Sequence, residues 1–179
     1  MSGYALRYFV LAPLCFALFY FEGLSPLYFV NELQTALTAH LTQAGIALFA
    51  MPIRMEGNTL VFEHGMRLYI VNACNGFASV LFFWSAVLAF PACVKAKFSW
   101  LLTGYAVLTA LNMVRILAVT YGVTLDAQSF WWSHDIVGRY GVGIFTLTLF
   151  WIFTRSVEIR RQNGLFFPLA APPLQKEKA

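Results

Sequence analysis

The chain has 179 residues, of which 60% are hydrophobic, 17% aromatic and only 11% charged. A soluble domain usually carries about 25% charged residues, so this composition excludes an ordinary soluble globular protein and indicates a polytopic membrane protein. The net charge of +4 does not indicate nucleic-acid binding, because the cations cluster at the ends of hydrophobic segments. By the positive-inside rule these ends lie in the cytoplasm. The cations are Lys95, Lys97, Arg155, Arg160 and Arg161.

The first hydrophobic segment, Tyr8–Phe21, follows Arg7. We expect it to span the membrane from a cytoplasmic N-terminus. No small-x-small motif closes the segment, so an uncleaved anchor is favoured over a secretory signal peptide.

The second segment, Asn31–Ala50, allows two interpretations. Its apolar residues recur at helical spacing, so we expect an amphipathic helix with one apolar face. These residues are Leu33, Leu37, Leu41, Ala44 and Leu48. The helix either lies on the outer membrane surface, partly inserted, or crosses the membrane while facing the bundle. The number of crossings favours the surface position if the N-terminus is cytoplasmic.

In residues 52–73 the helical pattern gives way to short alternating stretches, which we expect to form β-strands. Turn-forming residues at Gly57-Asn58 separate the first two of three apolar or alternating stretches. The stretches are Ile53–Glu56, Thr59–Phe62 and Met66–Val71. Because an open sheet edge is not tolerated in lipid, we expect a small β-hairpin-like insert on the extracytoplasmic surface.

Three further hydrophobic segments follow this insert. Phe77–Phe90 is expected to run inward, Trp100–Val119 to run back out, and Ile136–Phe153 to return to the basic end. Tyr121–Ser133 would form an outer loop, whose aromatic residues suit the lipid–water interface. These aromatic residues are Phe130, Trp131 and Trp132.

The predicted fold class is therefore an all-α polytopic membrane bundle of about 4–5 transmembrane helices, with the small β-insert and the amphipathic helix. Residues 1–161 would form a single integral-membrane domain. Residues 162–179, which contain three prolines and mixed charge, would form a flexible cytoplasmic tail.

Cys74, Arg115 and His134 are the candidate catalytic residues. Cys74 and His134 each stand just before a hydrophobic segment, whereas Arg115 lies near the C-terminal end of the segment between them. Because consecutive spans alternate in direction, all three residues would meet at the outer face. Cys74 stands where a strand gives way to a helix, and a helix N-terminus favours the thiolate. Cys93 is about 28 Å further along if the intervening chain is helical, too far for a disulfide. The alternative for Cys74 is a structural thiol.

Arg115 is the most informative charge, because an arginine within a hydrophobic span is costly unless it finds water or a partner. It could hold the thiolate, the developing oxyanion or a substrate carboxylate, and Asn112 shares its helix face. The alternative is an arginine that snorkels to the interface or forms a structural ion pair. Next to the cysteine, Asn75 is a candidate second-shell residue, and Gly76 would let a backbone or substrate approach closely.

His134 suits proton transfer at neutral pH, and Asp135 could orient it. Taken alone, it could equally be a surface residue at a helix start. Arg139 follows Asp135 by four positions, so an ion pair is expected, with substrate contact as the other option. The chain contains no HExxH, CxxC, GxSxG or glycine-rich phosphate motif, so neither a metal nor a cofactor is expected.

These motifs carry a family resemblance. The block Val71–Gly76, followed by Asn112–Arg115 and then His134 with Gly138, resembles the exosortase/archaeosortase family of membrane transpeptidases. The resemblance covers roughly residues 45–153. The short chain is similar to compact bacterial exosortases such as the exosortase H type.

The resemblance implies a cysteine transpeptidase at the periplasmic face of the bacterial inner membrane. Its partners would be exported proteins with a C-terminal sorting tail: a motif, a transmembrane helix and a basic end. The enzyme would cleave between motif and helix through a thioester and pass the protein to an acceptor. The alternatives are a membrane acyltransferase that uses Cys74, and a non-catalytic membrane assembly subunit.

Overall fold

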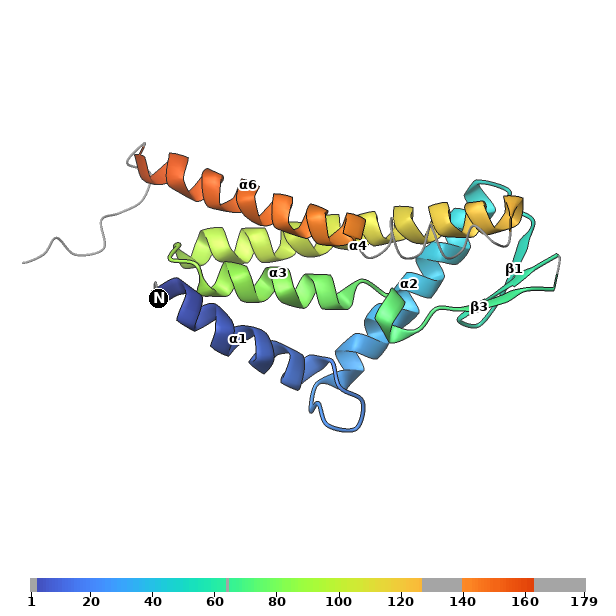
Figure 1. Cartoon of the computed structure of the whole chain (residues 1–179), viewed down its shortest axis with the longest axis horizontal. Helices are drawn as coiled ribbons and strands as arrows, with labels where there is room; N and C mark the ends of the chain where they lie inside the picture. The colour runs from blue at the N-terminus through green and yellow to red at the C-terminus, as the bar shows by residue number, and fades with distance from the viewer. Residues whose placement is uncertain (1–2, 64, 127–139, 163–179) are drawn as a thin grey trace, which may run out of the picture.

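The structure, a computed structural model, describes residues 3–63, 65–126 and 140–162. Within these ranges it contains helices, one three-stranded sheet and a short 3₁₀ helix, η1 (Figure 1). The elements in chain order are α1 (Gly3–Phe19), α2 (Tyr28–Leu48), β1 (Ile53–Glu56), β2 (Thr59–Phe62), β3 (Arg67–Tyr69), η1 (Asn72–Cys74), α3 (Phe77–Ala89), α4 (Val94–Leu125) and α6 (Val142–Gln162).

Helix α3 is the centre of the bundle and contacts α1, α4 and α6. Its apolar side chains form the main core with residues from α4 and α6. Gly104 of α4 lies against Phe83 of α3: a Cβ atom there would be 2.0 Å from the Phe83 ring. Glycine is therefore required for these two helices to approach so closely.

One end of the bundle is basic. The N-terminus of α1, the α3–α4 connection and the C-terminal end of α6 lie together there (Figure 1). Arg7, Lys95, Lys97 and Arg155 belong to these segments. Lys97 donates a hydrogen bond from Nζ to the carbonyl of Leu88 at 2.7 Å. The observed placement is the asymmetry expected of a cytoplasmic end.

Helix α4 is longer than predicted at both ends. It begins at Val94 instead of Trp100 and continues to Leu125, so an outer loop from Tyr121 is wrong for Tyr121–Leu125. The chain from Val94 to Leu125 contains no proline, and Asp126 still donates its N–H to the carbonyl of Gly122 at 3.0 Å. The rest of that predicted loop lies outside the described residues.

Two of the described helices, α4 and α6, are long and apolar enough to cross a membrane. Helices α1 and α3 are apolar but shorter, with 17 and 13 residues. The first residues of the segment predicted at Ile136–Phe153 lie outside the described ranges, and α6 extends it to Gln162. The number of spans stays a prediction, as does the flexible tail, which from residue 163 onward is not described.

The three strands form an antiparallel sheet in the order β1-β2-β3. Gly57-Asn58 makes a two-residue turn between β1 and β2, where Gly57 has a φ of +60°. Such tight hairpin turns need positive φ, which explains the glycine. The extracytoplasmic location of this insert stays a prediction.

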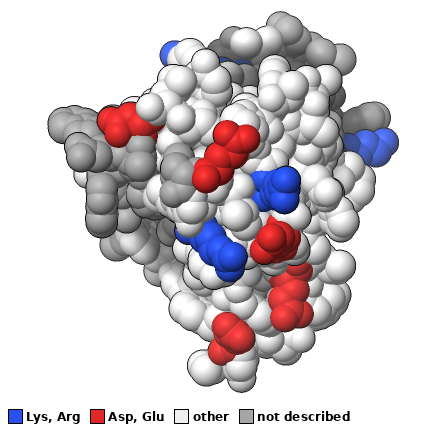
Figure 2. Space-filling view, turned by 90° about the vertical axis from the view of Figure 1, so that its right-hand side faces the viewer, with Lys and Arg blue, Asp and Glu red and all other residues white. Residues whose placement is uncertain are grey.

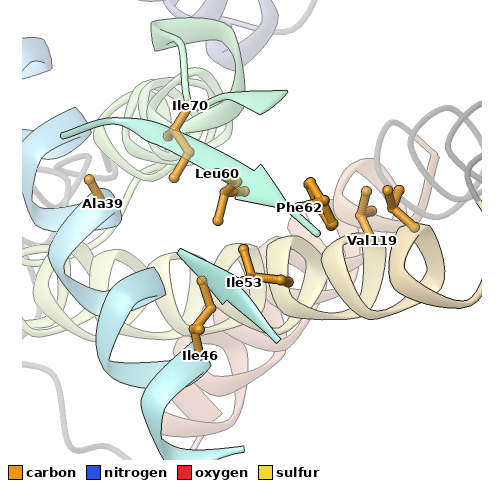
Figure 3. Packing of buried hydrophobic residues seen from close by; sticks show 8 residues of the cluster. Ala39, Ile46, Ile53, Leu60, Phe62, Ile70 and Val119 are labelled. Carbon is orange, nitrogen blue, oxygen red and sulfur yellow. The ribbon is translucent and has the colours of Figure 1, made fainter. Parts of the chain in front are cut away.

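The sheet packs through its apolar face against α2 and α4 (Figure 3). This second core cluster consists of Ala39, Ile46, Ile53, Leu60, Phe62, Ile70, Val119 and Val123. The sheet therefore occupies the end of the molecule opposite the basic end (Figure 1).

Helix α2 runs obliquely across the bundle near the sheet (Figure 1) and is apolar on its outside. Its leucines Leu33, Leu37, Leu41 and Leu48 are exposed, the last by 79%. Its buried face is polar instead: Asn31, Gln34, Thr35, Thr38 and Thr42 are at most 6% exposed. A polar face turned to the bundle is what the second interpretation of this segment requires. Helix α2 is not among the described helices that are long and apolar enough to cross a membrane, so its crossing stays a prediction.

Candidate functional site

Cys74 and Arg115 line one pocket between the sheet and α4. Its volume is about 80 Å³, and most of its walls are apolar. The lining residues are Leu60, Leu68, Tyr69, Ile70, Cys74, Arg115, Ile116, Val119 and Thr120. Figure 2 shows this end of the molecule, where basic and acidic side chains lie beside one another. The sulfur and the guanidinium predicted to share a site thus border the same space.

Cys74 is the last residue of η1, between β3 and α3. Its N–H donates to the carbonyl of Val71 at 2.8 Å, which closes the tight turn. The thiol is half-buried, and Cys74 forms no disulfide; Cys15 and Cys93 are likewise free. A free thiol at the wall of a pocket, two residues before the N-cap of an α-helix, is placed for nucleophilic chemistry.

Asn75 holds the backbone just after the cysteine. It is fully buried, and its Nδ2 donates to Asn31 Oδ1 at 2.7 Å and to Thr35 Oγ1 at 2.8 Å. Its Oδ1 accepts the N–H of Phe77 at 2.8 Å, so it satisfies a donor in the first turn of α3. Asn75 therefore anchors the Cys74 turn to α2 on one side and to α3 on the other.

A chain of hydrogen bonds extends this anchor. Gln34 donates from Nε2 to the carbonyl of Asn75 at 3.3 Å, and its Oε1 accepts the Tyr105 hydroxyl at 2.7 Å. Asn72 in η1 bonds to Thr35 and, through Nδ2, to the hydroxyl of Tyr28. Buried polar groups are stable only when bonded in this way.

Gly76 allows α4 to approach the turn. Its φ is +77°, and a Cβ atom there would lie 2.8 Å from Cγ and 2.9 Å from Cβ of Asn112. The space that the glycine leaves is therefore taken by the Asn112 side chain. This differs from the expectation that a substrate or another backbone segment uses the space.

Asn112 connects the two candidate catalytic residues. It is 1% exposed; its Nδ2 donates to the carbonyl of Cys74 at 3.0 Å, and its Oδ1 accepts from Arg115 Nη1 at 3.3 Å. One amide thus sets the position of the cysteine main chain relative to the guanidinium. The half-buried Arg115 lies against apolar walls, where a positive charge acts more strongly than in water.

The third predicted member of the site, His134, lies outside the described residues. So do Asp135, Gly138, Arg139 and the three interfacial aromatic residues. The meeting of His134 with Cys74 and Arg115 stays a prediction. Within residues 3–63, 65–126 and 140–162, no three or more His, Cys, Asp or Glu side chains form a group that could hold a metal ion.

Sequence reasoning missed the polar face of α2 as part of the site. The signal was present, because Asn31, Thr35, Thr38 and Thr42 recur at intervals of three and four residues, the spacing of one helix face. In a membrane protein the polar stripe, rather than the apolar one, indicates where a helix meets the bundle.

A family model described as Transmembrane exosortase (Exosortase_EpsH) matches residues 1–152. No curated protein and no solved structure matches the chain.

Proposed function

Because the chain belongs to the transmembrane exosortase family, we propose that it is a membrane-embedded cysteine transpeptidase with Cys74 as nucleophile. Its substrates would be exported proteins that end in a recognition motif, a transmembrane helix and a basic tail. The observation that carries the proposal is the shared pocket, in which a free thiol and a half-buried arginine border one apolar space.

In the proposed reaction, the Cys74 thiolate attacks the carbonyl carbon of the scissile peptide bond. Arg115 stabilises first the thiolate and then the negative oxygen of the tetrahedral intermediate. The carbon–nitrogen bond breaks, and the departing amine takes a proton from His134. The motif-bearing part of the substrate is left as a thioester on Cys74. An acceptor then attacks the thioester and gives its proton to His134, or water does so and the protein is released.

Asn112 and Asn75 act as positioning residues in this scheme. The Asn112 amide spans from the Cys74 carbonyl to Arg115, so a shift of α4 would move guanidinium and nucleophile together. Asn75 holds the Cys74 turn in place through its bonds to Asn31 of α2 and to the N–H of Phe77 in α3. Holding reacting groups in place before substrate arrives is a large part of catalysis.

The depth of the site supports action at the outer membrane face. Arg115 is 18 residues after Lys97 (115 minus 97), which lies at the basic end of α4. At about 1.5 Å per residue it lies about 27 Å further along the helix, close to the roughly 30 Å thickness of the hydrocarbon core. With the basic end in the cytoplasm, the pocket would open at the periplasmic surface. A substrate whose own helix entered the bilayer beside the bundle would present its scissile bond at that depth.

The test is processing in cells that make the enzyme together with an exported protein from the same genome that ends in a motif, a helix and a basic tail. Cys74→Ala should leave this protein uncleaved in the membrane. Cys93→Ala is the matched control, because Cys93 is a free, exposed thiol at the basic end, and it should process normally. Normal processing by Cys74→Ala would refute the proposal.

Trapping separates the proposed activity from its two alternatives. An electrophilic analogue of the sorting motif should add a peptide mass to the wild-type enzyme but not to Cys74→Ala. A lipid-sized thioester would instead indicate an acyltransferase. No adduct of either kind would indicate an assembly subunit.

A further inference from the structure

The edge of the sheet next to the pocket carries backbone groups that point away from β2. Strand β3 is the last strand in the order β1-β2-β3, and within the described ranges no strand pairs with its other side. Five residues after its end at Tyr69 comes Cys74. Tyr69 and Cys74 also line the same pocket.

The ladder between β2 and β3 identifies which groups face outward. Ile70 donates its N–H to the carbonyl of Asn58 at 2.8 Å, and Phe62 donates to Met66 at 3.0 Å. In an antiparallel pair, hydrogen-bonded and non-hydrogen-bonded positions alternate. Arg67 and Tyr69, opposite Val61 and Thr59, are therefore non-hydrogen-bonded positions. Their N–H and C=O groups point away from β2.

We infer that the substrate segment just before the scissile bond binds in extended form along this edge, as a fourth strand beside β3. This inference rests on the proposed transpeptidase function. A row of backbone donors and acceptors is matched by an extended peptide, which is how β-augmentation recognises its ligands. Continuity with the pocket selects the substrate as occupant, because a chain leaving the edge past Tyr69 arrives at Cys74.

The strand direction follows from the membrane geometry. Strand β3 runs toward η1, which contacts α2 and α3 (Figure 1). A substrate that continues into a transmembrane helix also runs from the outside toward the bundle, so it would lie parallel to β3. In a parallel pair, the substrate residue opposite Leu68 donates to the carbonyl of Arg67 and accepts from the N–H of Tyr69.

Backbone hydrogen bonds do not distinguish one substrate sequence from another. Selection of the recognition motif therefore depends on the substrate side chains, which point alternately to the two faces of the bound strand. Those on one face would point toward the apolar wall formed by Leu68 and Ile70. The others would face outward, like Arg67 and Tyr69, both of which are exposed.

Proline at position 69 tests the inference. Tyr69→Pro removes one outward N–H without removing a hydrogen bond to β2, a substitution that edge strands tolerate. Losing this bond, with the proline ring in the path of the incoming strand, should slow cleavage of the co-expressed sorting-tail protein by about 10-fold or more. Tyr69→Ala keeps the N–H and loses only the side chain at the pocket, so its loss of cleavage should be clearly smaller than that of Tyr69→Pro. Normal cleavage by Tyr69→Pro, or an equal loss in Tyr69→Ala, would overturn the inference.

A cross-linking measurement covers the case in which Tyr69→Pro fails to fold. Benzoylphenylalanine is placed at Val71, which is 49% exposed, in the Cys74→Ala background that retains substrate. The matched probe position is Tyr121, which is 54% exposed on α4. Cross-links from position 71 to residues just before the scissile bond support the inference. Cross-links to a second copy of the enzyme, or none to the substrate, overturn it.

The two proposals fail separately. If Cys74→Ala blocks processing while Tyr69→Pro and the cross-links give negative results, the transpeptidase stands and the substrate strand lies elsewhere. If Cys74→Ala processes normally, the transpeptidase itself is refuted.

Discussion

Replacing Gly76 by alanine should damage the site more than the same change at any open glycine with similar φ. With a φ of +77°, an L-residue at position 76 costs about 1–2 kcal/mol in backbone strain alone. The new Cβ would also lie 2.8 Å and 2.9 Å from two carbon atoms of Asn112. One of these is the Cβ of Asn112 itself, so a side-chain rotation cannot relieve the contact. Either α4 or the Cys74 turn must shift.

That shift would stretch the bonds from Asn112 to Cys74 and Arg115, at 3.0 Å and 3.3 Å. At about 1 kcal/mol each, their loss brings the total cost of Gly76→Ala to about 3–4 kcal/mol. For a chain of this size that corresponds to a fall in Tm of about 10 °C. Displacing the nucleophile by about 1 Å should also slow cleavage by about 100-fold.

Gly57→Ala is the matched control. Gly57 has a φ of +60° and nothing within 4 Å of the position a Cβ would take. It should therefore show only the backbone cost of about 1–2 kcal/mol, a fall in Tm of about 4 °C, and near-normal cleavage. Both variants are compared by thermal unfolding in detergent and by processing of the sorting-tail protein. Equal effects of the two substitutions on Tm and on cleavage would refute the reasoning.

Three further predictions test the surroundings of the site. Arg115→Lys keeps the positive charge but loses the planar guanidinium with its several N–H donors, so cleavage should fall by about 100-fold with Tm little changed. Near-full activity of this variant would show that only the charge of Arg115 is needed. Asn75→Ala leaves buried partners unsatisfied and should cost about 2–4 kcal/mol in thermal unfolding, against almost nothing for the exposed Asn58→Ala; equal Tm values would contradict the anchoring role. A spin label at Leu37, which is 39% exposed, should be relaxed by oxygen in lipid rather than by a water-soluble nickel complex; the reverse would show that the leucine face of α2 meets water.

Cys74 and Arg115 were predicted to share one end of the molecule because consecutive membrane helices alternate in direction. Both residues line one pocket, while the place of His134 stays a prediction. The family was also recognisable from short motifs in the right order, and the match over residues 1–152 confirms it.

The remaining features depend on contacts that no linear pattern encodes. Asn112 was expected only to share a helix face with Arg115, yet its amide also bonds the carbonyl of Cys74, 38 residues earlier. The extent of α4 was underestimated because hydropathy falls near Lys97 and again after Val119. Backbone hydrogen bonding does not stop where hydropathy falls, and the helix continues through both regions.

The most direct test of the central claim is the mass of the intact enzyme after reaction with a substrate peptide labelled on the motif side of the scissile bond. A thioester on Cys74 predicts a mass gain equal to the motif-side fragment, sensitive to hydroxylamine and absent in Cys74→Ala. The label should map to Cys74 in Cys93→Ala as well. Cleaved product without any labelled enzyme, or a label on Cys15 or Cys93, would contradict the account.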